Sequence, residues 1–280
     1  GDGAARFLRQ EGIFDALPIL ASTDRQNSNI AQWLTQWIPD ALIASAGDGC
    51  ALEKAAVALV RDRGGSTAQF IDTWYNYRRR FDFSDGLHLP DHILVIDQNA
   101  AREAAAEGIP ETLIHTVGHP WWESFPRWLP GPRNSVLFLG APVRRDYDHR
   151  LGYDETEMWQ CVRAAASDAP ELFETIWYGK HPEQNETDLG ELGNFELITN
   201  SMAKIAQAGT VLGAFSAPMV DAYLCGAKVV SVQPHPKGPD MCPMSRHGRI
   251  ARATSADELI SALKRGTETD RLDLDLALGN

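Results

Sequence analysis

The sequence predicts an α/β protein made of two doubly wound parallel sheets, one in each half of the chain, that face a cleft. Two observations lead to this fold class. Short apolar runs alternate with longer amphipathic stretches, and a segment rich in proline and tryptophan interrupts the alternation near the middle. Strand, helix and strand in this order form a parallel sheet covered on both faces. A chain of 280 residues suffices for about two domains.

The first domain is expected to span residues 1–119. Its apolar runs have the length of buried parallel strands and cover residues 17–22, 41–46, 67–72, 92–97 and 112–117. The helical patterns between them cover residues 29–37, 50–63 and 99–107, and Gly64 and Gly108 supply left-handed C-caps for the last two. Around Gly1 and Gly3 the sequence resembles a strand-to-helix turn without its strand, so a first strand is missing or the first sheet is small.

A linker is expected at residues 120–133, where prolines and tryptophans gather, and the second domain at residues 134–280. The predicted strands of this domain cover residues 135–140, 174–178, 210–214 and 228–233, and the predicted helices cover about 154–166, 200–208 and 217–225. A last helix begins at the S-x-x-E capping box of Ser255 and Glu258 and ends at Gly266.

Charge and composition restrict the partners. The chain has 26 Lys and Arg against 38 Asp and Glu, a formal charge of −12, which opposes binding to nucleic acid. A peripheral membrane association and a local pocket for a small anion stay open. The cysteines form no C-x-x-C pair and the N-terminus has no secretory pattern, so a reduced cytoplasmic setting is expected.

Ligands of open parallel sheets bind beyond the carboxyl ends of the strands. In the second domain we therefore expect a donor ligand at the residues that follow the strands: Gly140, Arg145, Lys180, His181, Ser216, Ala217 and Gln233. Lys180 and His181 precede Pro182, which would hold the imidazole outward, although the same residues also suit an ordinary surface turn.

The segment around Ser216 is the most informative. Ser216 is predicted at the N-cap of the helix that begins near Ala217, where unpaired amides and partial positive charge attract a phosphate. Asp221 lies one turn further on and could accept hydrogen bonds from a ribose. The alternative is that Ser216 only caps the helix and Asp221 only interacts favourably with its dipole.

In the first domain, Asp72 ends a predicted strand and is followed by Trp74, Tyr77 and Arg78. Aromatic rings stack on sugars and arginines pair with carboxylates or phosphates, so this is a candidate acceptor surface. The alternative is that the rings pack beneath a loop and the arginines are solvated. Single-stranded nucleic acid also suits such a pattern, but the net charge opposes it.

These motifs resemble a known group of proteins. The paired sheets, the Gly-His-Pro at 118–120 and the strand, Ser216, helix and Asp221 segment resemble the GT-B glycosyltransferases, with lipid-A-disaccharide synthase and the hydrolysing UDP-sugar 2-epimerases as relatives. Lys180-His181-Pro182 together with Ser216 is similar to the HP and Ser motifs of bacterial sialyltransferases and capsule or teichoic-acid transferases.

The resemblance implies two Rossmann-like domains and a nucleotide-sugar donor held by the second of them. His181 and Ser216 would contact the donor phosphate and Asp221 the ribose. The chain departs from the sialyltransferase-like pattern in having a single Ser where that motif has two polar residues, and it lacks the acidic catalytic motif of that family.

A transferase also needs a base with a pKa near neutrality for the acceptor hydroxyl, which suits His119 or a desolvated Asp72. Asp48 and Glu53 are weaker candidates. His119 could instead be a hinge residue packed against Trp121 and Trp122. The charge of the leaving group would be met by the helix at Ser216 and by Lys180 or Arg145.

Other chemistries lack their motifs: the sequence has no G-x-S-x-G elbow around Ser216 and no Walker A sequence. Asp273 and Asp275 only superficially resemble a metal-binding DxD, and the spacings of His235, Cys242 and His247 do not suit zinc.

We therefore predict a glycosyltransferase of cell-surface polysaccharide biosynthesis that works without a metal or cofactor and moves a sugar from a nucleotide-sugar donor to a glycan, lipid or protein acceptor. The alternatives are a hydrolysing nucleotide-sugar 2-epimerase and a non-catalytic binding subunit with the same fold.

Overall fold

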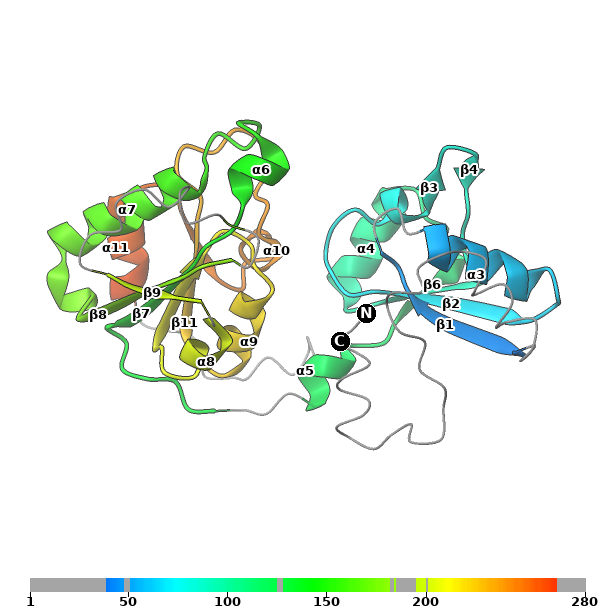
Figure 1. Cartoon of the computed structure of the whole chain (residues 1–280), viewed down its shortest axis with the longest axis horizontal. Helices are drawn as coiled ribbons and strands as arrows, with labels where there is room; N and C mark the ends of the chain where they lie inside the picture. The colour runs from blue at the N-terminus through cyan, green and yellow to red at the C-terminus, as the bar shows by residue number, and fades with distance from the viewer. Residues whose placement is uncertain are drawn as a thin grey trace. The chain divides into compact units, whose positions relative to one another are not determined.

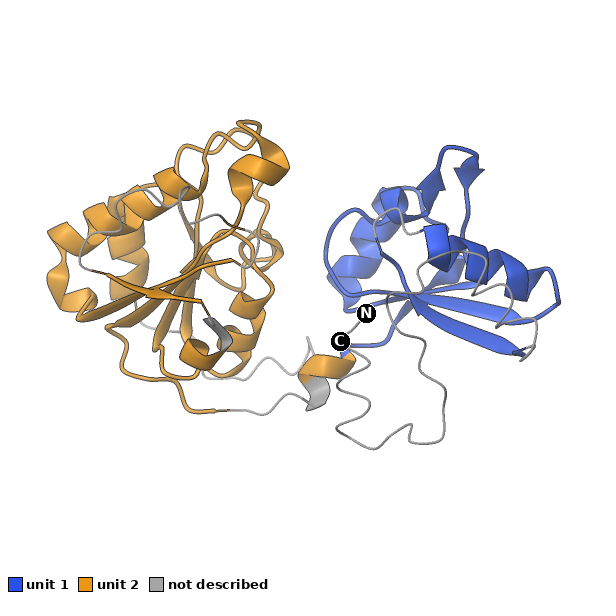
Figure 2. Cartoon of the chain, in the orientation of Figure 1, with its two compact units in different colours: residues 1–119, 278–280 blue, residues 120–277 orange. Residues whose placement is uncertain are grey.

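The computed structural model describes residues 39–47, 51–124, 128–181, 184, 195–199 and 201–265. The chain divides into two compact units, with the boundary between His119 and Pro120 (Figure 2). The strand predicted at 17–22, the helix predicted at 29–37, the glycine turn at the start, Asp48, Pro182, and the acidic pair Asp273 and Asp275 lie outside the described residues.

Unit 1 contains a four-stranded parallel sheet with the order β1-β2-β5-β6. Helix α3 packs on β1 and β2, and α4 packs on β6. The side chain of Asp97 caps α4 by accepting a hydrogen bond from the amide of Ala100. The elements are β1 (Ala41–Ser45), α3 (Ala51–Arg61), β2 (Ser66–Ile71), β5 (His92–Val95), α4 (Gln98–Ala106) and β6 (Ile114–Thr116).

A segment that the apolar pattern did not predict follows β2. It holds the 3-10 helix η2 (Arg78–Phe81) and an antiparallel hairpin of β3 (Asp82–Phe83) and β4 (Gly86–Leu87). A second 3-10 helix, η3 (Glu111–Leu113), precedes β6. These elements are too short to produce a periodic signal in the sequence.

Unit 2 contains a six-stranded sheet with the order β12-β11-β10-β7-β8-β9, and every pairing in it is parallel. Figure 1 shows α7 and α11 along one face of this sheet and α8 and α9 along the other. The strands are β7 (Ser135–Leu139), β8 (Thr175–Gly179), β9 (Glu196–Ile198), β10 (Thr210–Gly213), β11 (Lys228–Val232) and β12 (Ala251–Ala253). The prediction of an α/β protein with two parallel sheets is thereby confirmed.

The helices of unit 2 are α5 (Pro120–Ser124), α6 (Val143–Tyr147), α7 (Glu155–Asp168), η4 (Pro170–Leu172), α8 (Ser201–Ile205), α9 (Pro218–Leu224), α10 (Pro243–Arg246) and α11 (Ala256–Lys264). Val136 and Phe138 join the core cluster that contains Met158 and Val162 of α7. The intervening Leu137 is also buried, because side chains alternate between the two faces of a strand and both faces of this sheet are covered.

The segment 120–133, predicted as a linker, contains more structure than a linker needs. Helix α5 begins at Pro120, and the Trp122 side chain is buried. At the other end, the Thr210 hydroxyl donates a hydrogen bond to the carbonyl of Arg133 at 2.7 Å. Gly131 and Gly209 meet backbone to backbone, since a Cβ on Gly209 would lie 2.4 Å from the carbonyl oxygen of Gly131. The end of the predicted linker therefore packs against unit 2.

Within the described ranges, no helix combines the length and the apolar composition that crossing a bilayer requires.

Candidate functional site

The loops that follow β7 and β8 are joined by one glutamine. Because the strands are parallel, the loops after them leave the sheet at the same edge. The Gln184 amide nitrogen donates to the carbonyl oxygen of Ala141 at 3.2 Å. Its side-chain oxygen accepts a hydrogen bond from the backbone amide of His181 at 2.9 Å. The two loops are thus held side by side.

The loop after β10 is also joined to its neighbours, by an aromatic contact and by a serine hydroxyl. The ring of Tyr147 on α6 meets the ring of Phe215 edge to face, with centroids 5.7 Å apart. The hydroxyl of Ser231 on β11 donates a hydrogen bond to the carbonyl oxygen of Ala214 at 2.6 Å. Four loops of unit 2 therefore form one connected edge. We call this edge, comprising residues 140–145, 180–181, 214–217 and 233, the carboxyl edge of unit 2.

The helix mouth at Ser216 differs from the prediction. Helix α9 begins at Pro218 with Ala217 as its N-cap, so Ser216 lies one residue earlier and, among the described residues, no side chain caps the helix. Pro218 has no N–H to offer. The amides of Met219 and Val220 donate to the carbonyl oxygens of Ser216 and Ala217, at 3.0 and 2.9 Å. The first turn therefore has fewer free amides than the sequence suggested.

Ser216 and Ala217 nevertheless lie at the surface of this edge. Ser216 is half-buried and Ala217 is exposed. Within the described part of the chain, the Ser216 hydroxyl has no hydrogen-bond partner. It is thus available to donate to a ligand oxygen.

Asp221, expected to bind a ribose, points to a partner inside unit 2. Its side chain is buried, and its Oδ1 accepts a hydrogen bond from the indole nitrogen of Trp122 on α5 at 3.2 Å. The carboxylate thus anchors α5 to α9. Trp122 and Asp221 are 99 residues apart in the sequence, so this contact could not be predicted from local pattern.

Gly140 and Gln233 support the edge from within. The amide of Gly140 donates to the carbonyl oxygen of Gly179 at 2.8 Å, and a Cβ at Gly140 would lie 2.4 Å from the side-chain oxygen of Gln184. The glycine is needed so that Gln184 can bridge the loops, and its amide is not free for a phosphate. The expectation that Gly140 lies at the donor site stays a prediction, and any contact would have to come from atoms other than this amide nitrogen.

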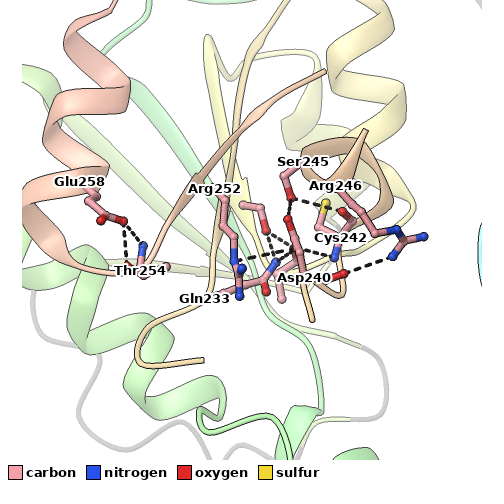
Figure 3. A network of polar contacts seen from close by, with 10 residues as sticks. Gln233, Asp240, Cys242, Ser245, Arg246, Arg252, Thr254 and Glu258 are labelled. Atoms are coloured by element: carbon pink, nitrogen blue, oxygen red, sulfur yellow. Dashed lines mark hydrogen bonds and ion pairs between the residues drawn. The ribbon is translucent and has the colours of Figure 1, made fainter. Parts of the chain in front are cut away.

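Gln233 is fully buried at the centre of a polar network (Figure 3). Its side-chain nitrogen donates to the Ser231 hydroxyl at 2.8 Å and to Asp240 Oδ1 at 2.6 Å. The other oxygen of Asp240 accepts from the Ser245 hydroxyl at 2.6 Å. Gln233 therefore fixes the loop after β11, so its place is beneath the surface of the edge.

The cationic candidates lie on the outer part of the edge. Arg145 on α6 is exposed, and its Nε donates to the neighbouring Asp146 Oδ1 at 2.7 Å. Lys180 and His181 are half-buried directly after β8, and the amide of Lys180 donates to the carbonyl oxygen of Ile198 at 2.9 Å. The backbone of Lys180 is thereby fixed by Ile198, and that of His181 by Gln184.

In unit 1, the structure brings His119 near Asp72. The imidazole meets the ring of Phe70 edge to face with centroids 5.6 Å apart. Burial lowers the pKa of His119 to about 4, against the opposing charge of Asp72, which raises it. A base works best with a pKa near the working pH, so the expectation that His119 has a pKa near neutrality is wrong.

The predicted acceptor surface is mostly interior. Tyr77 is fully buried, and its hydroxyl donates to Glu103 Oε2 at 3.0 Å, while the indole nitrogen of the buried Trp74 donates to Asp97 Oδ2 at 3.1 Å. Both rings belong to the core of unit 1, which corrects the expectation that they stack on an acceptor. Arg78 is exposed, and its amide donates to Glu107 Oε2 at 2.8 Å.

The described residues contain no group of three or more His, Cys, Asp or Glu side chains arranged to hold a metal ion. His235, Cys242 and His247 form no such group.

No protein-family model and no curated protein matches the sequence. Solved structures do match. The UDP-GlcNAc 2-epimerase from Methanocaldococcus jannaschii is 13% identical with a TM-score of 0.58, over 88% of this chain and 75% of that chain. The UDP-GlcNAc 2-epimerase from Neisseria meningitidis, solved with UDP-GlcNAc bound, is 12% identical with a TM-score of 0.57, over 91% and 75%.

A third match is Anabaena Alr3699/HepE, solved in complex with UDP-glucose. It is 12% identical with a TM-score of 0.56, over 90% of this chain and 75% of that chain. At these identities, similarity in structure establishes the fold. The two parallel α/β units in sequence, together with these matches across most of the chain, show that the protein has the GT-B fold.

Proposed function

We propose that this protein binds a nucleotide sugar at the carboxyl edge of unit 2 and transfers the sugar to an acceptor. One observation carries the proposal: the four loops of that edge are joined to one another, and they present Lys180, His181 and the hydroxyl of Ser216, which has no partner among the described residues. The matches to proteins solved with UDP-GlcNAc and with UDP-glucose support a UDP-linked donor.

The chemistry of the donor explains why such side chains are needed. A sugar leaves a nucleotide with negative charge developing on the phosphate oxygens, and donors or cations already in place stabilise that charge. The whole chain carries a formal charge of −12, so attraction of a phosphate depends on local groups. Lys180 and Arg145 supply positive charge, and His181 and Ser216 supply hydrogen bonds.

Titration of UDP-, CMP-, CDP- and GDP-linked ligands into the protein tests the binding step. We expect Ser216→Ala or His181→Ala to weaken nucleotide affinity by about 10- to 100-fold each, because a hydrogen bond to a charged group contributes about 1.5–3 kcal/mol. Ser261→Ala, on the exposed side of α11, and His115→Ala, in unit 1, are matched controls that should leave the affinity unchanged. Unchanged affinity in the first pair would refute the site.

The contact between Asp221 and Trp122 gives a second test of the donor site. Trp122→Phe removes the indole N–H but keeps an aromatic ring, so unfolding free energy should fall by about 1.5 kcal/mol. If Asp221 binds the ribose, the released carboxylate should at the same time bind nucleotide more tightly. Calorimetry measures the second effect and urea unfolding the first. A loss of stability with no gain in affinity would assign Asp221 a structural role only.

Two alternative functions, an epimerase and a non-catalytic binding subunit, can be distinguished by when the donor is consumed. The matches to UDP-GlcNAc 2-epimerases favour an epimerase, which would consume the donor with no acceptor present. The low pKa of His119 favours a binding subunit without a base, which would bind the donor and never consume it. A transferase consumes the donor only when an acceptor is added. Chromatography of the nucleotide products separates the three.

A further inference from the structure

Unit 1 has a cavity of its own that the proposed donor site does not use. It has a volume of about 420 Å³ and lies along α3, between that helix and the segment of η2 and the β3–β4 hairpin. This volume falls within the range of about 300–1,000 Å³ that is typical of small-molecule pockets. Its lining includes Lys54, Arg61, Arg80, Phe81, Phe83 and His88.

Arg80 is a buried cation that forms no ion pair with any residue the structure describes. Its side chain is among the buried charged groups, with the residue 9% exposed. Two of its guanidinium nitrogens donate to neutral oxygens, the carbonyl of Ala46 and, at 2.7 Å, the hydroxyl of Thr73. Its Nε has no hydrogen-bond partner, and among the described residues no carboxylate lies within ion-pair distance. A buried charge is costly unless it is paired.

The rim of the cavity already binds a carboxylate. Asp85, in the turn between β3 and β4, contacts Lys54 Nζ and lies 3.1 Å from His88 Nε2. The Lys54 ammonium also lies 4.5 Å from the centre of the Phe83 ring. The Asp85 side chain is 60% exposed. The hairpin thus places a removable carboxylate on Lys54 and His88, where a ligand carboxylate or phosphate could take its place.

The two described carboxylates that line the cavity, Glu53 and Asp62, form no ion pair with Arg80. Glu53 is occupied, because its oxygens accept hydrogen bonds from the Ser45 hydroxyl and, at 2.6 Å, from the amide of Gly47. Asp62 is exposed at the end of the helix beyond Arg61. Arg61 itself pairs with Asp91 at 3.1 Å. Among the described residues, Arg80 is therefore the lining arginine that forms no ion pair.

We propose that this cavity binds a small organic anion, a molecule of sugar size that carries a carboxylate or a phosphate. The anionic group replaces Asp85 at Lys54 and His88 and lies in the field of Arg80. The uncharged body of the ligand lies against the rings of Phe81 and Phe83. The site is independent of the nucleotide-sugar site in unit 2.

Titration calorimetry with four probes tests the proposal: glucuronate, glucose 6-phosphate, glucose and inorganic phosphate, each with UDP present at saturation to occupy the donor site. We expect one or both of the anionic sugars to bind and glucose not to bind. The comparison of glucuronate with glucose 6-phosphate identifies the anionic group. Binding of inorganic phosphate as tight as that of glucose 6-phosphate would contradict a role for the aromatic lining.

Variants of the rim give effects of opposite sign. Asp85→Asn removes the competing carboxylate and should raise affinity by about 2- to 5-fold. Lys54→Gln and Arg80→Gln should each lower it by about 10-fold or more. Arg79→Gln, the same change at the exposed neighbour of Arg80, should have no effect. If Arg80→Gln fails to fold, the probe affinities of Lys54→Gln and Asp85→Asn still test the proposal.

The proposal is overturned if neither anionic sugar binds the wild-type protein at millimolar concentration. It is equally overturned if Lys54→Gln and Asp85→Asn both leave the affinity of the bound probe unchanged. The two proposals fail separately. Loss of UDP binding in Ser216→Ala bears on the donor site in unit 2, whereas the binding of the anionic probes bears on the cavity in unit 1.

Discussion

Replacing Gly209 with alanine is expected to destabilise unit 2 by about 3 kcal/mol or more. A Cβ at this position would lie 2.1 Å from the carbonyl oxygen of Pro132 and 2.4 Å from that of Gly131. Both are backbone atoms, so no side chain can rotate away, and close-packed interiors do not absorb such overlap. Urea unfolding, or loss of soluble protein, measures the effect.

Gly226→Ala is the matched control because it isolates the other reason for a glycine. Gly226 has a φ of +84°, and a Cβ there would meet nothing within 4 Å. Its cost should be the backbone strain alone, about 1 kcal/mol. If the two substitutions cost the same, the close approach of residues 131–132 to Gly209 would be refuted.

The stability of the protein should fall by about 3 kcal/mol between pH 6.5 and pH 4 through His119 alone. Burial lowers the pKa of His119 to about 4 from 6.5, and each unit corresponds to about 1.4 kcal/mol. In that window the unfolded chain binds a proton that the folded chain does not. The contribution is therefore complete above pH 6.5 and is lost as the pH falls towards 4.

His119→Phe isolates this effect, because it keeps a ring against Phe70 and removes the titrating group. The difference between wild type and variant in unfolding free energy should grow more favourable to the variant as the pH falls from 6.5 to 4. Other titrating groups cancel in that difference. A difference that does not change with pH would mean that His119 has the same pKa in the folded and the unfolded chain. Its pKa would then be near neutrality, as a catalytic base requires.

The central strands were predictable because each is a short apolar run covered on both faces. The runs at 67–72 and 135–140 became β2 and β7 with bounds within a residue or so. The edge strands β9 and β12 were missed. Glu196 and Arg252 interrupt their short segments, because an edge strand faces solvent and need not be apolar. In unit 2, apolar patterning therefore reveals the middle of the sheet more readily than its edges, whereas in unit 1 the edge strands β1 and β6 were predicted as well.

The candidate site was predictable only as a set of loops. Parallel strands place the residues after them at one edge, so Lys180, His181 and Ser216 could be chosen from their positions alone. Their partners could not be found this way. Trp122 and Asp221 are 99 residues apart in the chain, and local pattern carries no information about such a pairing.

Burial was the other quantity that the sequence did not contain. Arg78, Arg79 and Arg80 are consecutive, yet only Arg80 is buried. Trp74 and Tyr77 follow a strand just as a binding surface would, but they fill the core beside α4. Short irregular segments have no periodicity that would separate an inward side chain from an outward one.

A crystal structure of the protein with UDP bound would show where the nucleotide binds. We expect the diphosphate at the carboxyl edge of unit 2, with its oxygens within hydrogen-bond distance of the Ser216 hydroxyl and the His181 imidazole. A nucleotide bound elsewhere, with the loops of residues 180–181 and 214–217 empty, would contradict this expectation.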